Sequence, residues 1–266
     1  MTSPTWIDSH CHVTADEFAS DQAEVIARAS AGHVDTLIAI GAGYGVAANA
    51  RAVELAARDP RVFATVGVHP HDAAQLDDAG KAQLRAWLAA PRVVAVGECG
   101  LDYWYEHSPR AEQREVFAWH VALARELRLP VSIHVRDRGS DAYEELLDIW
   151  RAEGRGETTG VLHCYTHELG FARRALDASL MISFSGILTF KRDRGLRDVA
   201  AALPLGRVLV ETDAPLLAPE GLRGRRNEPV HVARVGAALA LAQQRPLEEI
   251  AAATAANARA LFGLPQ

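Results

Sequence analysis

A pair of histidines near the amino end, in the stretch WIDSHCHV, could begin a metal site. On a helix His10 and His12 would point about 200° apart, but in a strand side chains alternate with a period of two and both imidazoles share one face. Two neutral imidazoles on one face suit a metal ion. Short histidine pairs also occur by chance in surface loops, so this stretch alone leaves both interpretations open.

Other metal-capable side chains come at the ends of apolar runs farther along the chain. An imidazole or a carboxylate that is buried without a partner costs several kcal/mol. A single such residue is more often a satisfied core group, but half a dozen at equivalent positions of successive strands point to bound cations. The motifs are GVHPH, VGECGLD, VSIHVRD, VLHCY and VLVETDAP, which carry His69, Glu98, His134, His163 and Asp213.

Six of these side chains form the predicted ligand set. A catalytic zinc takes three protein ligands and a water, so six are too many for one ion and suit two metals that share a carboxylate. Two-metal sites catalyse in-line displacement at phosphorus, and they also hydrolyse amides and esters. Mixed imidazole and carboxylate ligands are compatible with Zn, Mn or Mg. The set is His10, His12, Glu98, His134, His163 and Asp213.

Eight short β-rich apolar runs must position these residues. Helical stretches such as Ala111–Leu129 and Asp141–Ala152 lie between them, and a helical tail covers Val230–Phe262. This alternation implies parallel strands joined by crossovers, and eight units match the α/β class (β/α)8 TIM barrel, whose reactive groups lie at the carboxyl ends of the strands. An open doubly wound sheet is the alternative, but it usually carries a Gly-rich phosphate turn where this chain has His-Cys-His. The runs are Trp6–His12, Asp35–Gly41, Val62–His69, Val93–Gly97, Val131–Val135, Gly160–Cys164, Leu180–Ser185 and Arg207–Thr212.

Composition bounds the class of protein. The 266 residues are 49% apolar and 23% charged and contain no linker-like tract, so we expect one hydrolase barrel domain over residues 1–266. No apolar run is long enough to span a membrane, no secretory leader is evident, and three cysteines lack a disulfide framework, which favours a cytoplasmic location. The sequence leaves the oligomeric state open, and a monomer is the default expectation. The net charge of −6 excludes a global basic field, so a polyanion would have to be held by local arginines or bound cations.

The motifs together resemble a known family. DSHCH, GVHPH, GECGLDY, PVSIHVRD, VLHCY, GILTFK, ETDAP and RNEP, in this order, are similar to those of the TatD family of metal-dependent deoxyribonucleases, within the amidohydrolase superfamily, from Ile7 to about Phe262. The resemblance implies a barrel with two divalent ions that hydrolyses phosphodiester bonds. It also implies that the substrate is DNA, either as single strands or at the 3′ ends of strands.

The resemblance implies a role for each matched metal ligand. His10 and His12 match the ligands of a first metal, and His134 and His163 match those of a second. Glu98 matches the carboxylate that bridges both ions.

Further residues match, or could support, the chemistry. The resemblance makes Asp213 the carboxylate that contacts the first metal and the attacking water, so that Asp213 and Glu98 are the expected catalytic residues, and it gives His69 a contact to substrate phosphate. Arg136 has two open interpretations, a bidentate phosphate clamp or a helix-start charge paired with Asp137 or Asp141.

The loop after Glu98 carries the aromatic run YWY. Unpaired bases stack on such rings, but each of Tyr103, Trp104 and Tyr105 could instead pack beneath the loop. Asp102, just before them, is expected to order the loop through hydrogen bonds.

Three functions are compatible with these residues. The first is a DNase of this family, the second is an amidohydrolase that cleaves a small amide, lactone or ester, and the third is a metal-binding scaffold without turnover. A complete ligand set beside a carboxylate base argues against the third. Arginines that follow the seventh and eighth apolar runs, among them Arg197 and Arg223, are expected at the rim of the barrel mouth. Together with the family resemblance they favour phosphodiesters over the second function.

Overall fold

The computed structural model describes residues 4–192 and 194–265, and all eight predicted strands are present. They form one eight-stranded sheet in chain order, and each is followed by helix before the next strand begins, which confirms the (β/α)8 TIM-barrel class. The strands are β1 (Trp6–Cys11), β2 (Val34–Ile40), β3 (Val62–Val66), β4 (Val93–Asp102), β5 (Val131–Arg136), β6 (Gly160–Leu162), β7 (Leu180–Phe184) and β8 (Val208–Val210).

The helices follow the predicted alternation, with one correction. The tail expected as one helical stretch over Val230–Phe262 is two helices, because Gln244 takes a left-handed conformation and Pro246 follows it. No helix among the described residues is apolar and long enough to cross a membrane. The α-helices are α1 (Gln22–Ala31), α2 (Asn49–Arg58), α3 (Asp78–Leu88), α4 (Arg110–Leu127), α5 (Asp141–Gly154), α6 (Leu169–Asp177), α7 (Arg194–Ala202), α8 (Val232–Gln243) and α9 (Leu247–Phe262).

Strand β4 is longer than predicted. We expected it to end at Gly97 with Glu98 just beyond, but it continues to Asp102 because its later residues keep pairing with β5. The register shifts between Gly97 and Cys99, so Glu98 lies at a bulge inside the strand. Gly100 permits the continued pairing, since its φ is +148° and a Cβ there would lie 1.8 Å from the carbonyl oxygen of His134.

The chain forms two compact units. The first comprises Met1–Ala39, His163–Leu176 and Met181–Gln266, and the second comprises Ile40–Leu162 and Asp177–Leu180. In the first unit β1 pairs with β2 and β7 pairs with β8, while in the second β3, β4, β5 and β6 pair in succession. The single hydrolase domain expected over residues 1–266 stays a prediction.

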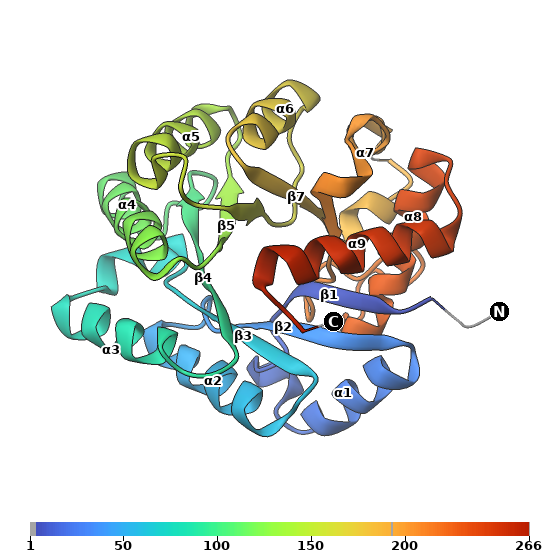
Figure 1. Ribbon diagram of the computed structural model, residues 1–266, viewed down its shortest axis with the longest axis horizontal. Coiled ribbons are helices and arrows are strands. Elements are labelled where there is room, and N and C mark those ends of the chain that lie inside the picture. Colours follow the sequence, from blue (N-terminus) through green and yellow to red (C-terminus); the bar gives the residue numbers. More distant parts are fainter. Residues whose placement is uncertain (1–3, 193, 266) are drawn as a thin grey trace. The chain divides into compact units, whose positions relative to one another are not determined.

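Helices α8 and α9 hold β1 and β8 in the first unit. Helix α9 lies along β1 (Figure 1), and α8 also contacts this strand. The indole of Trp6 packs where Gly236 of α8 leaves no side chain, since a Cβ there would lie 2.1 Å from the ring. The amide of Asn257 on α9 donates to the carbonyls of Leu205 and Val208, each at 2.8 Å. These contacts fix the start of β8, whose far end leads to the ETDAP motif.

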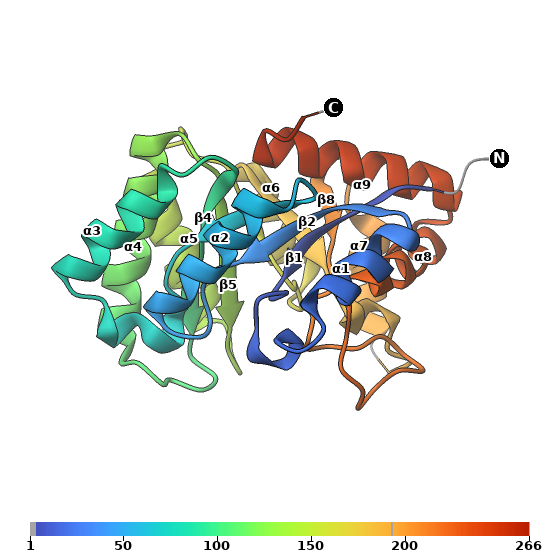
Figure 2. The same ribbon diagram turned by 90° about the horizontal axis from the view of Figure 1, so that it is seen from below.

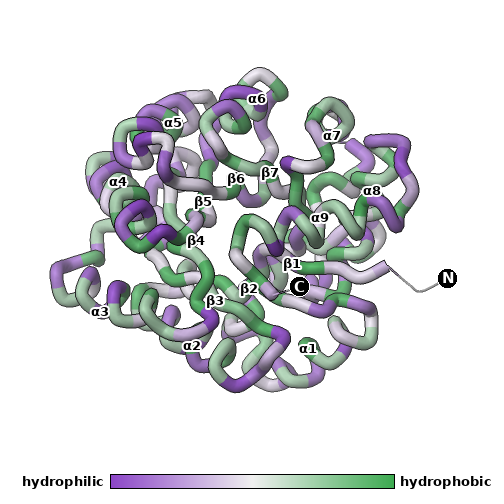
Figure 3. Tube along the Cα trace, viewed as in Figure 1, coloured by the Kyte–Doolittle hydropathy of each residue, from purple (hydrophilic) through white to green (hydrophobic). Residues whose placement is uncertain are grey.

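In the second unit α2 to α5 pack against β3, β4 and β5 (Figure 2). The strand β3 and the first four residues of β4 are almost uniformly hydrophobic, whereas hydrophobic and hydrophilic residues alternate along α3 and α4 (Figure 3). This is the pattern of parallel strands buried on both faces and of helices with one face in water.

Two buried side chains fix the turn after β3. The amide of Asn49 donates to the carbonyl of Gly67 at 2.9 Å and accepts the Gly67 N–H at 3.0 Å. His120 Nε2 accepts the N–H of Val68 at 3.2 Å, and its Nδ1–H donates to the carbonyl of Val116 at 2.7 Å. The backbone that carries the GVHPH motif after β3 is therefore rigid.

His120 should make folding sensitive to acid. Burial lowers its pKa from 6.5 to about 4, so the unfolded chain takes up the proton first and stability falls as the pH drops from about 6.5 towards 4. Between pH 7.5 and 5 the expected loss from this residue is about 2 kcal/mol. His120→Gln should lose about that much less than the wild type over the same interval, as measured by urea unfolding. Equal acid sensitivity of the two proteins would contradict this prediction.

Candidate functional site

Three metal-capable side chains of the first unit meet at the carboxyl ends of β1 and β8. The Nε2 atoms of His10 and His12 lie 3.4 Å apart, and Asp213 Oδ1 lies 3.6 Å from the first and 3.5 Å from the second. An ion with tetrahedral bonds of about 2.1 Å would hold its ligands about 3.4 Å apart. The β1/β8 cluster, His10, His12 and Asp213, therefore has donor atoms and spacing that fit a divalent ion.

Backbone pairing places the members of this cluster. Asp213 N–H donates to the carbonyl of His10 at 2.9 Å, and His12 N–H donates to that of Ala214 at 2.7 Å. The alternation expected from the sequence is confirmed, since both imidazoles turn toward the same carboxylate. Burial by itself raises the pKa of Asp213, but the hydrogen bond with His12 and the adjacent His10 bring that pKa below its usual value.

His163 also belongs to the first unit, where a carboxylate orients it. Its ring stacks on that of His10, with centroids 3.8 Å apart and planes at 5°. Its Nδ1 lies 3.3 Å from Glu211 Oε1, and the same oxygen accepts the N–H of Cys164 at 2.6 Å. His10, His163 and Glu211 can together offer a metal three donor atoms within 4.8 Å of one another.

Glu211 is a functional candidate that the sequence reasoning missed. It is buried, and it precedes Asp213 by two residues in ETDAP, so period-two alternation would have placed it on the same face. A carboxylate behind a ligand histidine fixes the ring and raises its basicity as a ligand.

The second unit holds another cluster, on β4, β5 and the turn after β3. Glu98 Oε1 lies 3.1 Å from His134 Nδ1 and 3.6 Å from His69 Nε2. His134 Nε2 lies 3.1 Å from Asp102 Oδ2, which is also 2.9 Å from His71 Nε2. The β4/β5 cluster, Glu98, His134 and His69, thus unites two predicted ligands with the residue predicted to contact phosphate.

Asp102 connects this cluster to the loop that follows it. Its Oδ1 accepts the N–H groups of Trp104 at 3.0 Å and Tyr105 at 2.9 Å, so its predicted loop-ordering role is confirmed. Burial alone raises the pKa of Asp102, but hydrogen bonds with His134 and His71 outweigh it and hold that pKa well below its usual range. The ionised carboxylate therefore orients both imidazoles.

Arg136 does not form the ion pair that one interpretation expected. Asp137 caps the start of α5 by accepting the N–H groups of Gly139 and Ala142, and Asp141 Oδ2 lies 3.9 Å from Arg110. Within residues 4–192 and 194–265 Arg136 has no carboxylate partner; its guanidinium lies over the rings of Trp104 and Tyr105.

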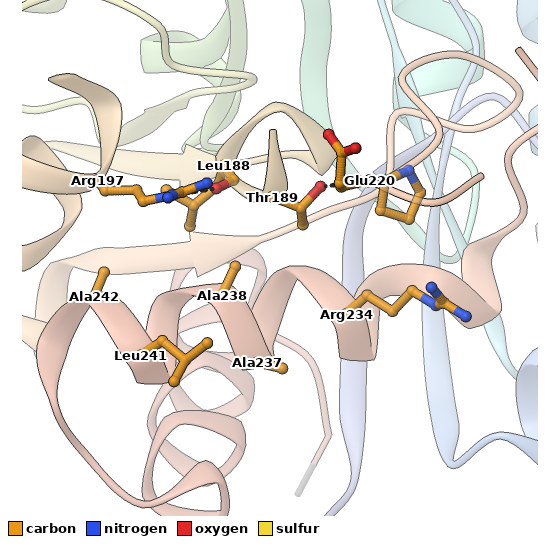
Figure 4. Close-up of a pocket in the computed structure, with 10 residues that line it drawn as sticks. Leu188, Thr189, Arg197, Glu220, Arg234, Ala237, Ala238, Leu241 and Ala242 are labelled. Atoms are coloured by element: carbon orange, nitrogen blue, oxygen red, sulfur yellow. Dashed lines mark hydrogen bonds between the residues drawn. The ribbon is translucent and has the colours of Figure 1, made fainter. Parts of the chain in front are cut away.

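The first unit also contains a cavity of about 470 Å³ that none of the cluster residues lines. Leu188, Thr189 and Arg197 lie on one side and the α8 residues Ala238, Leu241 and Ala242 on the other (Figure 4). Arg197 donates to the carbonyls of Leu188 and Phe190, which stabilises the segment after β7. This cavity is separate from the candidate metal ligands.

Comparison with known proteins gives a consistent result. Residues 7–263 match the family model described as TatD related DNase. The chain is 37% identical to the uncharacterized metal-dependent hydrolase YabD of Bacillus subtilis, over 96% of this chain and 98% of YabD. It is 35% identical to the 3′-5′ ssDNA/RNA exonuclease TatD of Salmonella typhimurium, again over 96% and 98%. The crystal structure of YjjV, a TatD homolog from Escherichia coli, matches with a TM-score of 0.90 and 32% identity over 98% of both chains.

The placement of Glu211 predicts an effect on metal affinity. Glu211→Gln keeps the shape of the side chain but removes the charge behind His163, so the affinity for Mn²⁺ or Zn²⁺ should fall about 10- to 100-fold. Competition with a fluorescent chelator measures this affinity. Glu220→Gln, which alters a carboxylate of the same unit that lines the separate cavity, is the control. Unchanged affinity in Glu211→Gln would exclude the role assigned here.

Proposed function

The chain belongs to the TatD-related DNase family of metal-dependent hydrolases, and from this premise we propose that it hydrolyses phosphodiester bonds in DNA, from the 3′ end of single strands. The triangle of donor atoms formed by His10, His12 and Asp213 is the observation that carries the proposal. The exonuclease name of the Salmonella relative supports the substrate class. The cytoplasmic location and the monomeric state expected from the sequence stay predictions.

We propose that six residues ligate two divalent ions, Mg, Mn or Zn. Each predicted ligand lies within a cluster of imidazole and carboxylate atoms in its own unit, and most of these side chains are buried. Buried imidazoles and carboxylates whose donor atoms face one another suit these ions. The residues are His10, His12, Glu98, His134, His163 and Asp213.

The remaining chemistry is assigned to the side chains around the ions. Bound divalent ions would supply positive charge at the phosphoryl oxygens and lower the pKa of an attacking water. Asp213, whose lowered pKa keeps it ionised, orients this water and takes its proton. The water oxygen bonds to phosphorus as the bond to the leaving sugar oxygen breaks, and Asp213 returns the proton to that oxygen.

His69 is suited to contact the substrate phosphate. Its Nδ1 accepts the backbone N–H of His71 at 3.1 Å, so the neutral ring carries its proton on Nε2. This N–H can donate to a phosphate oxygen. Arg136, whose guanidinium is not engaged by a carboxylate among the described residues, is the second candidate for such a contact.

Hydrolysis of a labelled oligonucleotide tests the proposed function. With Mg²⁺ or Mn²⁺ the wild type should shorten a 5′-labelled single strand one nucleotide at a time, while Asp213→Ala should bind the strand and cleave it at least about 100-fold more slowly. Asp213→Asn keeps one side-chain oxygen that can ligate a metal but cannot accept the proton of the water. Comparison of this variant with Asp213→Ala therefore separates loss of the base from loss of an oxygen ligand. Turnover of small esters, lactones or amides with an intact oligonucleotide would favour the amidohydrolase alternative and contradict the proposal.

Metal content tests the role of Glu98. If this carboxylate bridges both ions, Glu98→Ala should contain fewer than two ions per chain and lose activity, because each ion loses a ligand. Elemental analysis of the purified variant beside the wild type gives the number directly. Two ions retained in the variant would exclude the bridging role.

A further inference from the structure

The loop after β4 exposes two large aromatic rings beside two arginines. Trp104 is 40% exposed and Tyr105 is 50% exposed, whereas the neighbouring Tyr103 is only 3% exposed. The Arg136 guanidinium lies 5.2 Å from the ring centroid of Trp104 and 5.0 Å from that of Tyr105, and Arg138 lies 4.9 Å from that of Trp104. Packing beneath the loop therefore explains the presence of an aromatic ring at Tyr103, but it does not explain the exposed rings of Trp104 and Tyr105.

Neither arginine is neutralised by a carboxylate among the described residues. Arg136 and Arg138 differ in this respect from two arginines at the start of α4. Arg110 pairs with Glu106, and Arg114 pairs with Glu145. A guanidinium that lies over an aromatic face keeps N–H groups at its edge available for oxygen acceptors. The exposed surface thus combines aromatic faces with two positive charges on a chain whose net charge is −6.

The backbone that carries the rings is fixed. Asp102 Oδ1 accepts the N–H groups of Trp104 and Tyr105, and the N–H of Tyr103 donates to the carbonyl of Arg136 at 2.8 Å. The phenol ring of Tyr105 is nearly parallel to the imidazole of His107, at 6°, with centroids 5.7 Å apart. A ligand that stacks here would meet rings carried on a fixed backbone, so binding would require little ordering of the loop.

The same carboxylate ties these rings to the β4/β5 cluster. Asp102 Oδ2 faces His134 and His71, and the ring of His71 meets that of Tyr105 edge to face at 5.7 Å. The exposed rings therefore stand beside candidate catalytic groups of their own unit. An extended ligand that reaches His134 would pass over or beside them.

We propose that Trp104, Tyr105, Arg136 and Arg138 form a base-stacking platform for a single-stranded nucleic acid, with bases against the parts of the rings that the guanidinium groups leave exposed and phosphates at the edges of those guanidinium groups. This subsite rests on the proposed function, because it would bind the substrate strand beside the β4/β5 cluster. Unpaired bases offer free faces, and stacking on aromatic rings tolerates any sequence. The bases of a duplex are stacked on one another, so the platform selects single strands.

Binding of a nuclease-resistant phosphorothioate oligonucleotide tests the platform. Fluorescence anisotropy should show Trp104→Leu and Tyr105→Leu each weakening the binding of an eight-nucleotide single strand about tenfold. The loss should be much smaller on an otherwise identical abasic strand, which has no bases to stack. DNA and RNA versions of the strand show which sugar the platform accepts. Trp87→Leu on α3 controls for the loss of an indole elsewhere, and thermal unfolding confirms that each variant is folded.

Two further readouts separate stacking from other effects. Binding should quench indole fluorescence in the wild type and less in Trp104→Leu. Arg138→Gln should lower the slope of log Kd against log salt concentration by about one, since one phosphate contact is lost. Wild-type affinity in both aromatic variants, or an equal loss on intact and abasic strands, would overturn the platform.

These experiments distinguish failure of the platform from failure of the proposed nuclease activity. Base-dependent binding without hydrolysis of a natural oligonucleotide would keep the platform and reject the nuclease activity. Hydrolysis with binding that is independent of the bases would keep the activity and reject the platform.

Discussion

The close approach of imidazole and carboxylate donor atoms in a buried place is the constraint on which the rest of the site depends. In the β1/β8 cluster three donor atoms lie within 3.6 Å of one another. Lone pairs that face one another at this distance repel unless a proton or a cation lies between them, and a divalent ion satisfies all three together. The fold maintains this arrangement through the β1 and β8 backbones and through Asp8, which accepts the Thr212 N–H at 2.9 Å.

In each unit a further carboxylate orients one of the predicted metal-ligand histidines. Glu211 holds His163 in the first unit, and Asp102 holds His134 in the second. Both carboxylates are buried, and each also accepts backbone N–H groups, which makes its position as rigid as the chain around it. A ligand ring fixed at one nitrogen presents the other in a defined direction, so binding requires little rearrangement.

The strand order and most of the donor residues could be predicted from the sequence, because strand periodicity and the carboxyl-end rule are local patterns. The period of two along a strand is enough to place His10 and His12 on one face. The bulge at Glu98 could not be predicted, since it follows from the pairing of β4 with β5 and from the freedom of Gly100. The role of Glu211 could not be predicted, because no local pattern shows that it faces His163, 48 residues earlier in the chain. The contrast between buried Tyr103 and exposed Trp104 arises only from the folded loop.

Anomalous diffraction from crystals grown with Mn²⁺ is the most direct measurement of the central claim, that these donors hold divalent ions. The account predicts one peak within about 2.3 Å of the Nε2 atoms of His10 and His12, and a second within the same distance of a Glu98 carboxylate oxygen and a His134 ring nitrogen. A map with no peak at either cluster, or with manganese bound only to surface carboxylates, would contradict it.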